Sequence, residues 1–208
     1  MRKISIFTAI ACLSLTVLSL TQYSCNETAT AKADSVSVPK TMTHGEMVAR
    51  GKYLVTAGSC TDCHSPKIFT PLGPVLDSTK TLSGHPAGMP MMPIDKKVLK
   101  PGYWVLMTPD VTSFVGPFGA SFAANLTPDS TTGLGAWTED VFVRTIRTGK
   151  HLGQEGGRPI LPPMPWQTIA LYTDEDLKSI FAYLQSIPPI SNKVPAPLTP
   201  DDISKMKD

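Results

Sequence analysis

The clearest chemistry in this sequence comes from two cysteines and a histidine within five positions. Cys60 and Cys63 are three positions apart and His64 follows directly, so the run reads C-x-x-C-H, the sequence form of covalent haem attachment. On a helical turn the two thiols lie on one side, where both reach the vinyl groups along one porphyrin edge. The imidazole of His64 then falls beneath the iron as its first axial ligand. We therefore predict one covalently attached haem c.

Other chemistries fit this run less well. A structural zinc site needs four ligands, usually a second Cys or His pair at matching spacing, and no such pair follows. A thioredoxin-like redox pair would lie near a β-α-β pattern, which the flanking sequence lacks. A chance match and a non-haem metal or thiol protein are the remaining alternatives.

Met164 is the leading candidate for the second axial ligand. It lies between Pro163 and Pro165, which exclude a helix and restrict the backbone, so a flexible thioether is presented in one place. Thioether ligation raises the reduction potential and suits electron transfer. The alternatives are that Met164 packs in a loop on an aromatic ring, that the position is open, or that a rival side chain fills it. The rivals are three methionines and two histidines: Met89, Met91, Met92, His85 and His151.

Further residues are weaker candidates. Arg158 is a candidate contact for a haem propionate, with a solvated arginine as the alternative. Trp137, Trp166 and Tyr53 are candidates either to line the haem or to pack in the general core. His44 is most simply a surface residue.

A helix is predicted immediately before the C-x-x-C-H run. Thr43 and Glu46 have the spacing of a capping box, and the helix they open runs to about Val55. Gly51 lies in its middle and would permit a close crossing of the last helix, although an incidental weak point in the helix is the alternative.

Three more helices are predicted in the C-terminal half. Thr138 caps one that Gly149 ends, and a short one covers about 167–171. The last begins after Thr173 with three acidic residues, and Pro188 follows its end. Its apolar residues recur at helical spacing: Leu177, Ile180, Phe181 and Leu184.

The segment 66–132 has a different composition. Ten prolines exclude long helices there, and the apolar run 103–107 is a candidate strand. We predict a long Pro/Gly-rich insertion, with one small hairpin, that folds over the haem edge between the haem motif and Met164. The predicted fold is mostly α, with three to five helices around one haem.

The N-terminus is predicted to be a signal peptide over residues 1–24. Arg2 and Lys3 form a basic start, and 4–20 is apolar but interrupted by hydroxyl side chains and too short for a transmembrane span. Export agrees with haem c, which is attached after translocation to an oxidising compartment. The predicted location is therefore the periplasm.

Cys25 suggests a lipoprotein cleavage site, although Gln22 occupies the position where leucine is usual. Lipidation would leave the protein on a membrane anchor facing the periplasm or cell exterior. Cleavage to a free form is the alternative. Residues 25–41 are predicted to be a flexible tether, 42–190 the monohaem domain, and 191–208 a mobile tail.

Composition excludes some partners. The 208 residues suggest one domain, and 41% hydrophobic residues permit a core. The net charge of +2 comes from Arg2 and Lys3, so the chain without its signal is neutral. Neither nucleic-acid binding nor a polybasic membrane patch is indicated, and the only predicted membrane link is a lipid on Cys25.

The chain resembles the cytochrome c modules of the cytochrome subunits of bacterial alcohol and gluconate dehydrogenases. The resemblance covers about 43–190. It rests on the helix and C-x-x-C-H order, on Asn-Leu-Thr-Pro-Asp at 125–129 with Gly-Leu-Gly-Ala-Trp at 133–137, and on Pro-Pro-Met-Pro at 162–165. It implies a class I cytochrome c fold with His64 and Met164 as axial ligands, and electron transfer as the function. Those subunits carry three haem modules and a C-terminal anchor, whereas this sequence has one C-x-x-C-H.

Three functions are compatible with this sequence. The leading one is a non-enzymatic, monohaem carrier of single electrons between a dehydrogenase or quinol-oxidising complex and a terminal oxidase or reductase. The second is a dedicated cytochrome subunit of a periplasmic dehydrogenase complex, with 66–132 as its docking face. The third is a haem-based ligand sensor with a vacant or displaceable sixth position.

Overall fold

The first helix starts where its capping residues predict. The computed structural model describes residues 41–206, so the predicted signal peptide, Cys25 and nearly all of the predicted tether lie outside the described residues. Helix α2 (His44–Ala57) begins after Thr43, whose Oγ1 accepts a hydrogen bond from the Glu46 amide at 3.3 Å. Glu46 Oε2 accepts one in return from the Thr43 amide at 2.7 Å, so the capping box is confirmed. The helix extends two residues beyond its predicted end.

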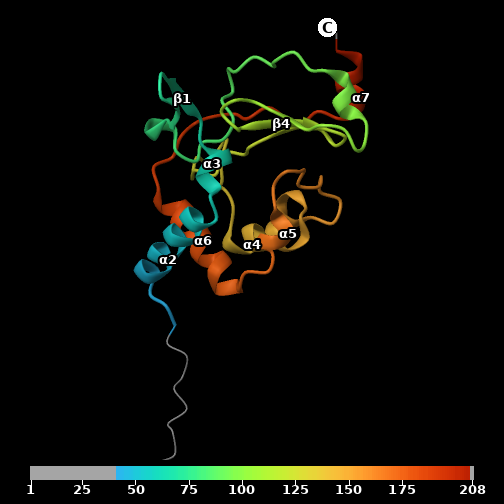
Figure 1. Ribbon diagram of the computed structural model, residues 1–208. Helices are drawn as coiled ribbons and strands as arrows, with labels where there is room; N and C mark the ends of the chain where they lie inside the picture. The colour runs from blue at the N-terminus through green and yellow to red at the C-terminus, as the bar shows by residue number, and fades with distance from the viewer. Residues whose placement is uncertain (1–40, 207–208) are drawn as a thin grey trace, which may run out of the picture. The chain divides into compact units, whose positions relative to one another are not determined.

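Helix α6 (Asp174–Ser186) crosses α2 closely, as Figure 1 shows. A Cβ atom on Gly51 would lie 1.9 Å from the Ser179 carbonyl oxygen, so only glycine permits this approach. Arg50 Nε donates to Asp176 Oδ1 at 2.5 Å across the same pair of helices. The prediction that Gly51 allows the helix before the motif to meet the helix that begins after Thr173 is confirmed.

Helix α4 (Glu139–Thr148) completes the larger hydrophobic core. Its N-cap Thr138 accepts a hydrogen bond from the Val141 amide at 3.2 Å, and Gly149 ends it at a φ of 63°. The core consists of apolar side chains from α2, α4, α6 and two loops: Val55, Leu82, Leu134, Phe142, Ile146, Leu177, Ile180, Phe181 and Leu184. All four apolar residues predicted to face inward from the last helix belong to it.

The other helical segments before residue 173 are short. They are α3 (Cys60–His64), α5 (Trp166–Ile169) and the 3₁₀ turns η1 (Ser78–Lys80), η2 (Lys96–Leu99) and η3 (His151–Gly153). Helix α5 starts one residue earlier and ends two residues earlier than predicted. Within residues 41–206, no helix combines the length and the hydropathy that crossing a bilayer requires.

The insertion contains more sheet than the sequence predicted. Strands β1 (Lys67–Thr70) and β2 (Gly73–Leu76) form one antiparallel hairpin. Strands β3 (Leu106–Met107), β4 (Ser113–Gly116) and β5 (Gly119–Phe122) form a second antiparallel sheet in that order. The prolines exclude long helices, but tight turns still allow short stretches of this segment to pair as strands. The fold described is therefore mixed helix and sheet, which corrects the expectation of a mostly α protein.

The C-terminal segment is packed, which corrects the predicted mobile tail as far as residue 206. Leu198 and Ala120 exchange backbone hydrogen bonds of 2.9 and 3.0 Å, so 198 continues the edge of the second sheet. Helix α7 (Pro200–Lys205) then buries Ile203 completely. The second, smaller core is apolar: Val98, Val115, Ala120 and Ile203. Proline content suggested mobility, but the segment supplies both a strand edge and a core residue.

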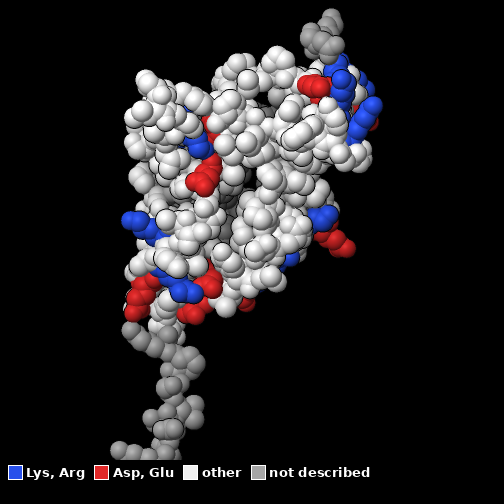
Figure 2. Space-filling view, in the orientation of Figure 1, with Lys and Arg blue, Asp and Glu red and all other residues white. Residues whose placement is uncertain are grey.

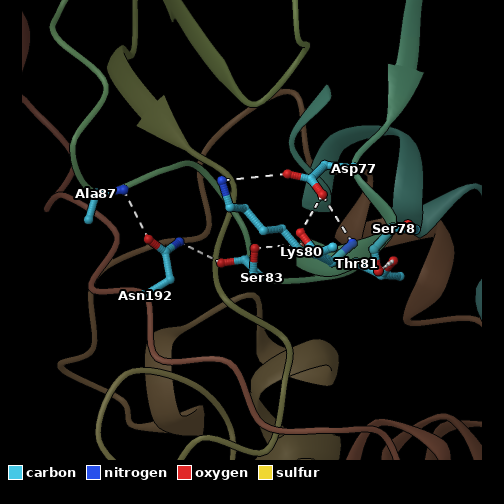
Figure 3. Close-up of polar contacts among 8 residues, drawn as sticks. Asp77, Ser78, Lys80, Thr81, Ser83, Ala87 and Asn192 are labelled. Atoms are coloured by element: carbon cyan, nitrogen blue, oxygen red, sulfur yellow. Dashed lines mark hydrogen bonds and ion pairs between the residues drawn. The ribbon is translucent and has the colours of Figure 1, made fainter. Parts of the chain in front are cut away.

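Asn192 fastens the start of this segment to the insertion. Its Nδ2 donates to the carbonyl of Ser83 at 2.7 Å and to that of His85 at 2.9 Å. Its Oδ1 accepts from the Ala87 amide at 2.9 Å, as Figure 3 shows beside the Lys80–Asp77 ion pair. A single side chain therefore satisfies three backbone groups of the loop.

Candidate haem-attachment site

The two cysteines and the histidine lie together on the single turn of α3. Gly58 caps α2, and Ser59 adopts a left-handed conformation at φ 54°, which turns the chain so that α3 begins at once. Cys60 and Cys63 are partly buried free thiols, not a disulfide. Burial raises the pKa of both thiols. Two free thiols one turn apart, followed by an imidazole, are the donor set that covalent haem attachment needs, so these residues fit the group.

The ring of His64 is oriented by the backbone of a distant segment. Nδ1 lies 2.8 Å from the carbonyl oxygen of Ala124, which can only accept, so Nδ1 carries the proton and donates. Nε2 is then the nitrogen with a free lone pair. Burial lowers the pKa of His64, which favours the neutral imidazole that binds metals. A ligating histidine held in this way by a carbonyl is typical of metal sites in general.

A buried loop supports the same histidine from its backbone. The carbonyl of His64 accepts a hydrogen bond from the Gly84 amide at 2.7 Å, and the next amide, of His85, donates to Ala123 at 2.8 Å. Gly84 has a φ of 80°, and a Cβ on it would lie 2.5 Å from the Ala123 carbonyl oxygen. Glycine at 84 is therefore required for this loop to fit beside the segment that carries Ala124.

Lys67 connects α3 to the insertion through two hydrogen bonds. Its Nζ donates to the backbone carbonyl of Asp62, within the motif, and to that of Asp110 at 2.7 Å. Lys67 is also the first residue of β1. The base of the hairpin that follows the motif is thus hydrogen-bonded both to α3 and to the backbone at Asp110.

Met164 lies in a loop that is held at three points. The Ile160 amide donates to the Gly149 carbonyl at 2.8 Å, and Ser121 Oγ donates to the Pro162 carbonyl at 2.7 Å. The indole of Trp166 covers Gly149 so closely that a Cβ there would lie 2.5 Å from the ring. Met164 itself is partly buried and lines a hollow of about 250 Å³.

One short segment links the two predicted axial ligands. Ser121 holds the Met164 loop, and Ala124, three residues later, holds the ring of His64. Three residues of chain span at most about 11 Å. The loop that carries Met164 and the ring of His64 are therefore held by residues three positions apart, one in β5 and one just after it.

The other candidate residues have different surroundings. The side chain of Arg158 is exposed and forms no hydrogen bond or ion pair with the residues described. Although the residue is exposed, neighbouring atoms desolvate its guanidinium enough to lower its pKa. Trp137 and His151 pack edge to face with centroids 5.8 Å apart, so His151 already has an aromatic partner. Tyr53 is exposed on α2.

The rival methionines lie elsewhere. His85, Met89, Met91 and Met92 line a separate hollow of about 500 Å³, and none of residues 60–64 nor Met164 lines it. The rivals are thus grouped with one another and not with the C-x-x-C-H motif.

The sequence did not identify the residues that position the ligands. Ala124 acts through its carbonyl, and no side-chain pattern signals such a role. Asn125 is buried and donates to the carbonyl of Ile190 at 2.8 Å, while its Oδ1 accepts from the Thr127 amide at 3.0 Å. The run 125–129 carries part of the family resemblance, and its asparagine was also a usable signal that the turn after Ala124 is fixed.

Charge is spread thinly over the face drawn in Figure 2. Figure 2 shows Lys, Arg, Asp and Glu in separate small groups, mostly toward the edges of the face drawn, with uncharged residues between them. Neither sign forms one continuous patch on this face, so it produces no strong field to steer a highly charged partner.

Comparison with known proteins agrees with the site. No protein-family profile matches the chain. The cytochrome c subunit of gluconate 2-dehydrogenase from Pantoea cypripedii is 30% identical over 74% of this chain and 27% of its own length. The cytochrome c subunit of alcohol dehydrogenase (quinone) from Gluconacetobacter polyoxogenes is 32% identical over 69% and 25%. The fructose dehydrogenase cytochrome subunit from Gluconobacter japonicus is 27% identical over 75% and 24%.

The motif on α3 and these similarities define a c-type cytochrome. The chain resembles the cytochrome c modules of dehydrogenase subunits, as its sequence motifs predict. It spans about a quarter of the length of each of these relatives. A match over 74% of the chain includes residues 60–64 wherever it begins, so the similarity covers the attachment motif.

Removing both thiols is expected to abolish covalent haem. Each cysteine is predicted to form one thioether, so the double variant Cys60→Ala/Cys63→Ala should leave no bond to hold the haem on the unfolded chain. Haem staining of the full-length protein after denaturing electrophoresis measures this directly. Thr61→Ala, on the same turn, should stain like the wild type. Persistent staining of the double variant would contradict the assignment.

Proposed function

We propose that this protein is the electron-accepting cytochrome subunit of a dehydrogenase complex, with one haem c. The observation that carries the proposal is the similarity of a chain with one C-x-x-C-H to cytochrome subunits of three dehydrogenases. This reading is better supported than a free carrier, because those relatives are named as subunits. The chain itself is proposed to catalyse no reaction of the substrate.

Each residue of the site has a defined task in this proposal. Haem c, when bound, supplies an iron that accepts and releases one electron. Cys60 and Cys63 would hold it, and the imidazole of His64, oriented by Ala124, would bind its iron. The thioether of Met164 would be the second protein ligand, supported by the anchoring of its loop to Ser121 and Gly149. Arg158, whose guanidinium has no ion pair with any described residue, is proposed to neutralise a propionate.

The proposed location is the periplasmic side of a membrane. The support is the N-terminal sequence, with a signal-like segment and Cys25 as a lipidation site. Electrons would pass onward from the haem to a quinol-linked complex or a terminal oxidase. The sensor alternative requires a vacant sixth position, and the fixed position of the Met164 loop argues against it.

Substrate-driven reduction tests the proposal. The full chain, carrying a C-terminal tag, is purified from its native host under conditions that preserve complexes. Gluconate, fructose and ethanol are then added separately while the haem absorbance is followed. We expect one substrate class to reduce the haem, and a Cys60→Ala/Cys63→Ala preparation to show no signal. A haem that stays oxidised with every substrate, on a chain that runs at its monomer size, would overturn the subunit assignment.

A further inference from the structure

We propose that the insertion contains a second metal site, which binds monovalent copper through one imidazole and several thioethers. The site is the hollow of about 500 Å³ beside the second sheet. One histidine and four methionines line it: His85, Met89, Met91, Met92 and Met107. Five potential soft or borderline ligands thus come from three separate stretches of the insertion.

His85 is oriented as a metal-binding histidine would be. The residue is 3% exposed, and its Nδ1 lies 2.7 Å from Thr112 Oγ1. Thr112 Oγ1 in turn donates to Asp110 Oδ2 at 2.7 Å, so its own proton is committed and it accepts from Nδ1. The chain from carboxylate through hydroxyl to imidazole fixes the tautomer, as carboxylates do for ligating histidines.

The second nitrogen of His85 is available to a ligand. No hydrogen bond to its Nε2 occurs in the described part of the chain. In that part, every side-chain nitrogen or oxygen that is fully buried from solvent has a hydrogen-bond partner. Nε2 is therefore exposed to open space. His85 lines the methionine hollow, whereas Thr112, the partner of Nδ1, does not, so Nε2 is the ring nitrogen on the side of the hollow.

The lining selects the class of metal. Carboxylates and thiols are absent from it, so calcium, magnesium and zinc find no suitable ligand set there. Thioethers together with an imidazole favour Cu(I) among biological metals. Met91, Met92 and Met107 are 38%, 51% and 63% exposed, so their flexible side chains are free to turn inward onto an ion.

Competition with a chromophoric Cu(I) chelator tests the site. The haem-loaded full chain is used, reduced and without oxygen, because the porphyrin then occupies Cys60 and Cys63. A Cys25→Ala variant, measured in parallel, excludes copper binding by that thiol. We expect the wild type to withdraw one copper from the chelator. Met91→Leu/Met92→Leu should bind at least about tenfold more weakly, because it loses two thioethers at nearly constant volume. Met47→Leu/Met206→Leu, which changes two methionines outside the hollow, is the matched control and should bind like the wild type.

X-ray absorption at the copper edge supplies a second measurement. Sulfur together with a single imidazole nitrogen around the copper is the expected result, and the sulfur contribution should fall in Met91→Leu/Met92→Leu. The proposal is overturned if the wild type leaves all copper on the chelator, if the control pair weakens binding equally, or if the spectrum contains no sulfur. An unchanged haem spectrum in both variants separates this site from the attachment site.

Discussion

Replacing Met164 with leucine is expected to convert the haem iron from six-coordinate to five-coordinate and to lower its reduction potential. Leucine has nearly the same volume as methionine, so the loop held by Ser121 and Gly149 stays in place while the sulfur is lost. Thioether ligation favours ferrous iron, and axial ligands together tune haem potentials over roughly 0.8 V. A fall of at least about 100 mV is therefore a conservative expectation.

Redox titration measures the potential, and the weak long-wavelength sulfur-to-iron band of the oxidised protein reports the ligand itself. The band should vanish in Met164→Leu, and the reduced variant should bind carbon monoxide rapidly. Met92→Leu is the matched control, because it removes a rival methionine from the other hollow. The axial assignment is wrong if the band survives in Met164→Leu or disappears in Met92→Leu.

The helices and the attachment motif were accessible from the sequence because their signals are local. A capping threonine, a terminating glycine and an apolar stripe each act within one or two helical turns. The sequence therefore predicts the cap at Thr43, the helix end at Gly149 and the burial of Leu177, as observed. The crossing of α2 and α6 at Gly51 was also predictable, since a glycine within a helix leaves room for a second helix to approach closely.

The insertion and the C-terminal segment were less accessible because their order depends on partners distant in sequence. Strand β4 pairs with β3 and β5, but nothing local distinguishes its four residues from a loop. Asn192 is ordered by carbonyls more than a hundred positions earlier. Prolines indicate where helices cannot form, but they do not indicate which segments will pair as strands. Ala124 illustrates the extreme case, since its role at the site belongs to its backbone alone.

Substituting Gly51 with alanine is expected to have the largest effect on stability of any single methyl group added to this chain's helices. The new Cβ would lie 1.9 Å from the Ser179 carbonyl oxygen and 2.8 Å from the Cβ of Tyr183. Both neighbours belong to α6, and the first is backbone, so the two helices must separate. We expect the free energy of unfolding to fall by about 3 kcal/mol, the upper part of the usual range for overpacking. Because only two residues separate α2 from α3, displacement of α2 should also disturb the position of the C-x-x-C-H turn.

Gly45 provides the matched control because it lies on the same helix, and a Cβ added to it would meet no atom from outside its own helix turn within 4 Å. Gly45→Ala should leave stability unchanged or raise it by up to about 1 kcal/mol, through lower entropy of the unfolded chain. Urea unfolding of the haem-loaded protein, followed by far-UV circular dichroism, compares both variants with the wild type. If Gly51→Ala unfolds at the wild-type midpoint, α2 and α6 do not cross as closely as described. The support that this crossing gives to the attachment turn would then have to come from Lys67 and the loop at Gly84 instead.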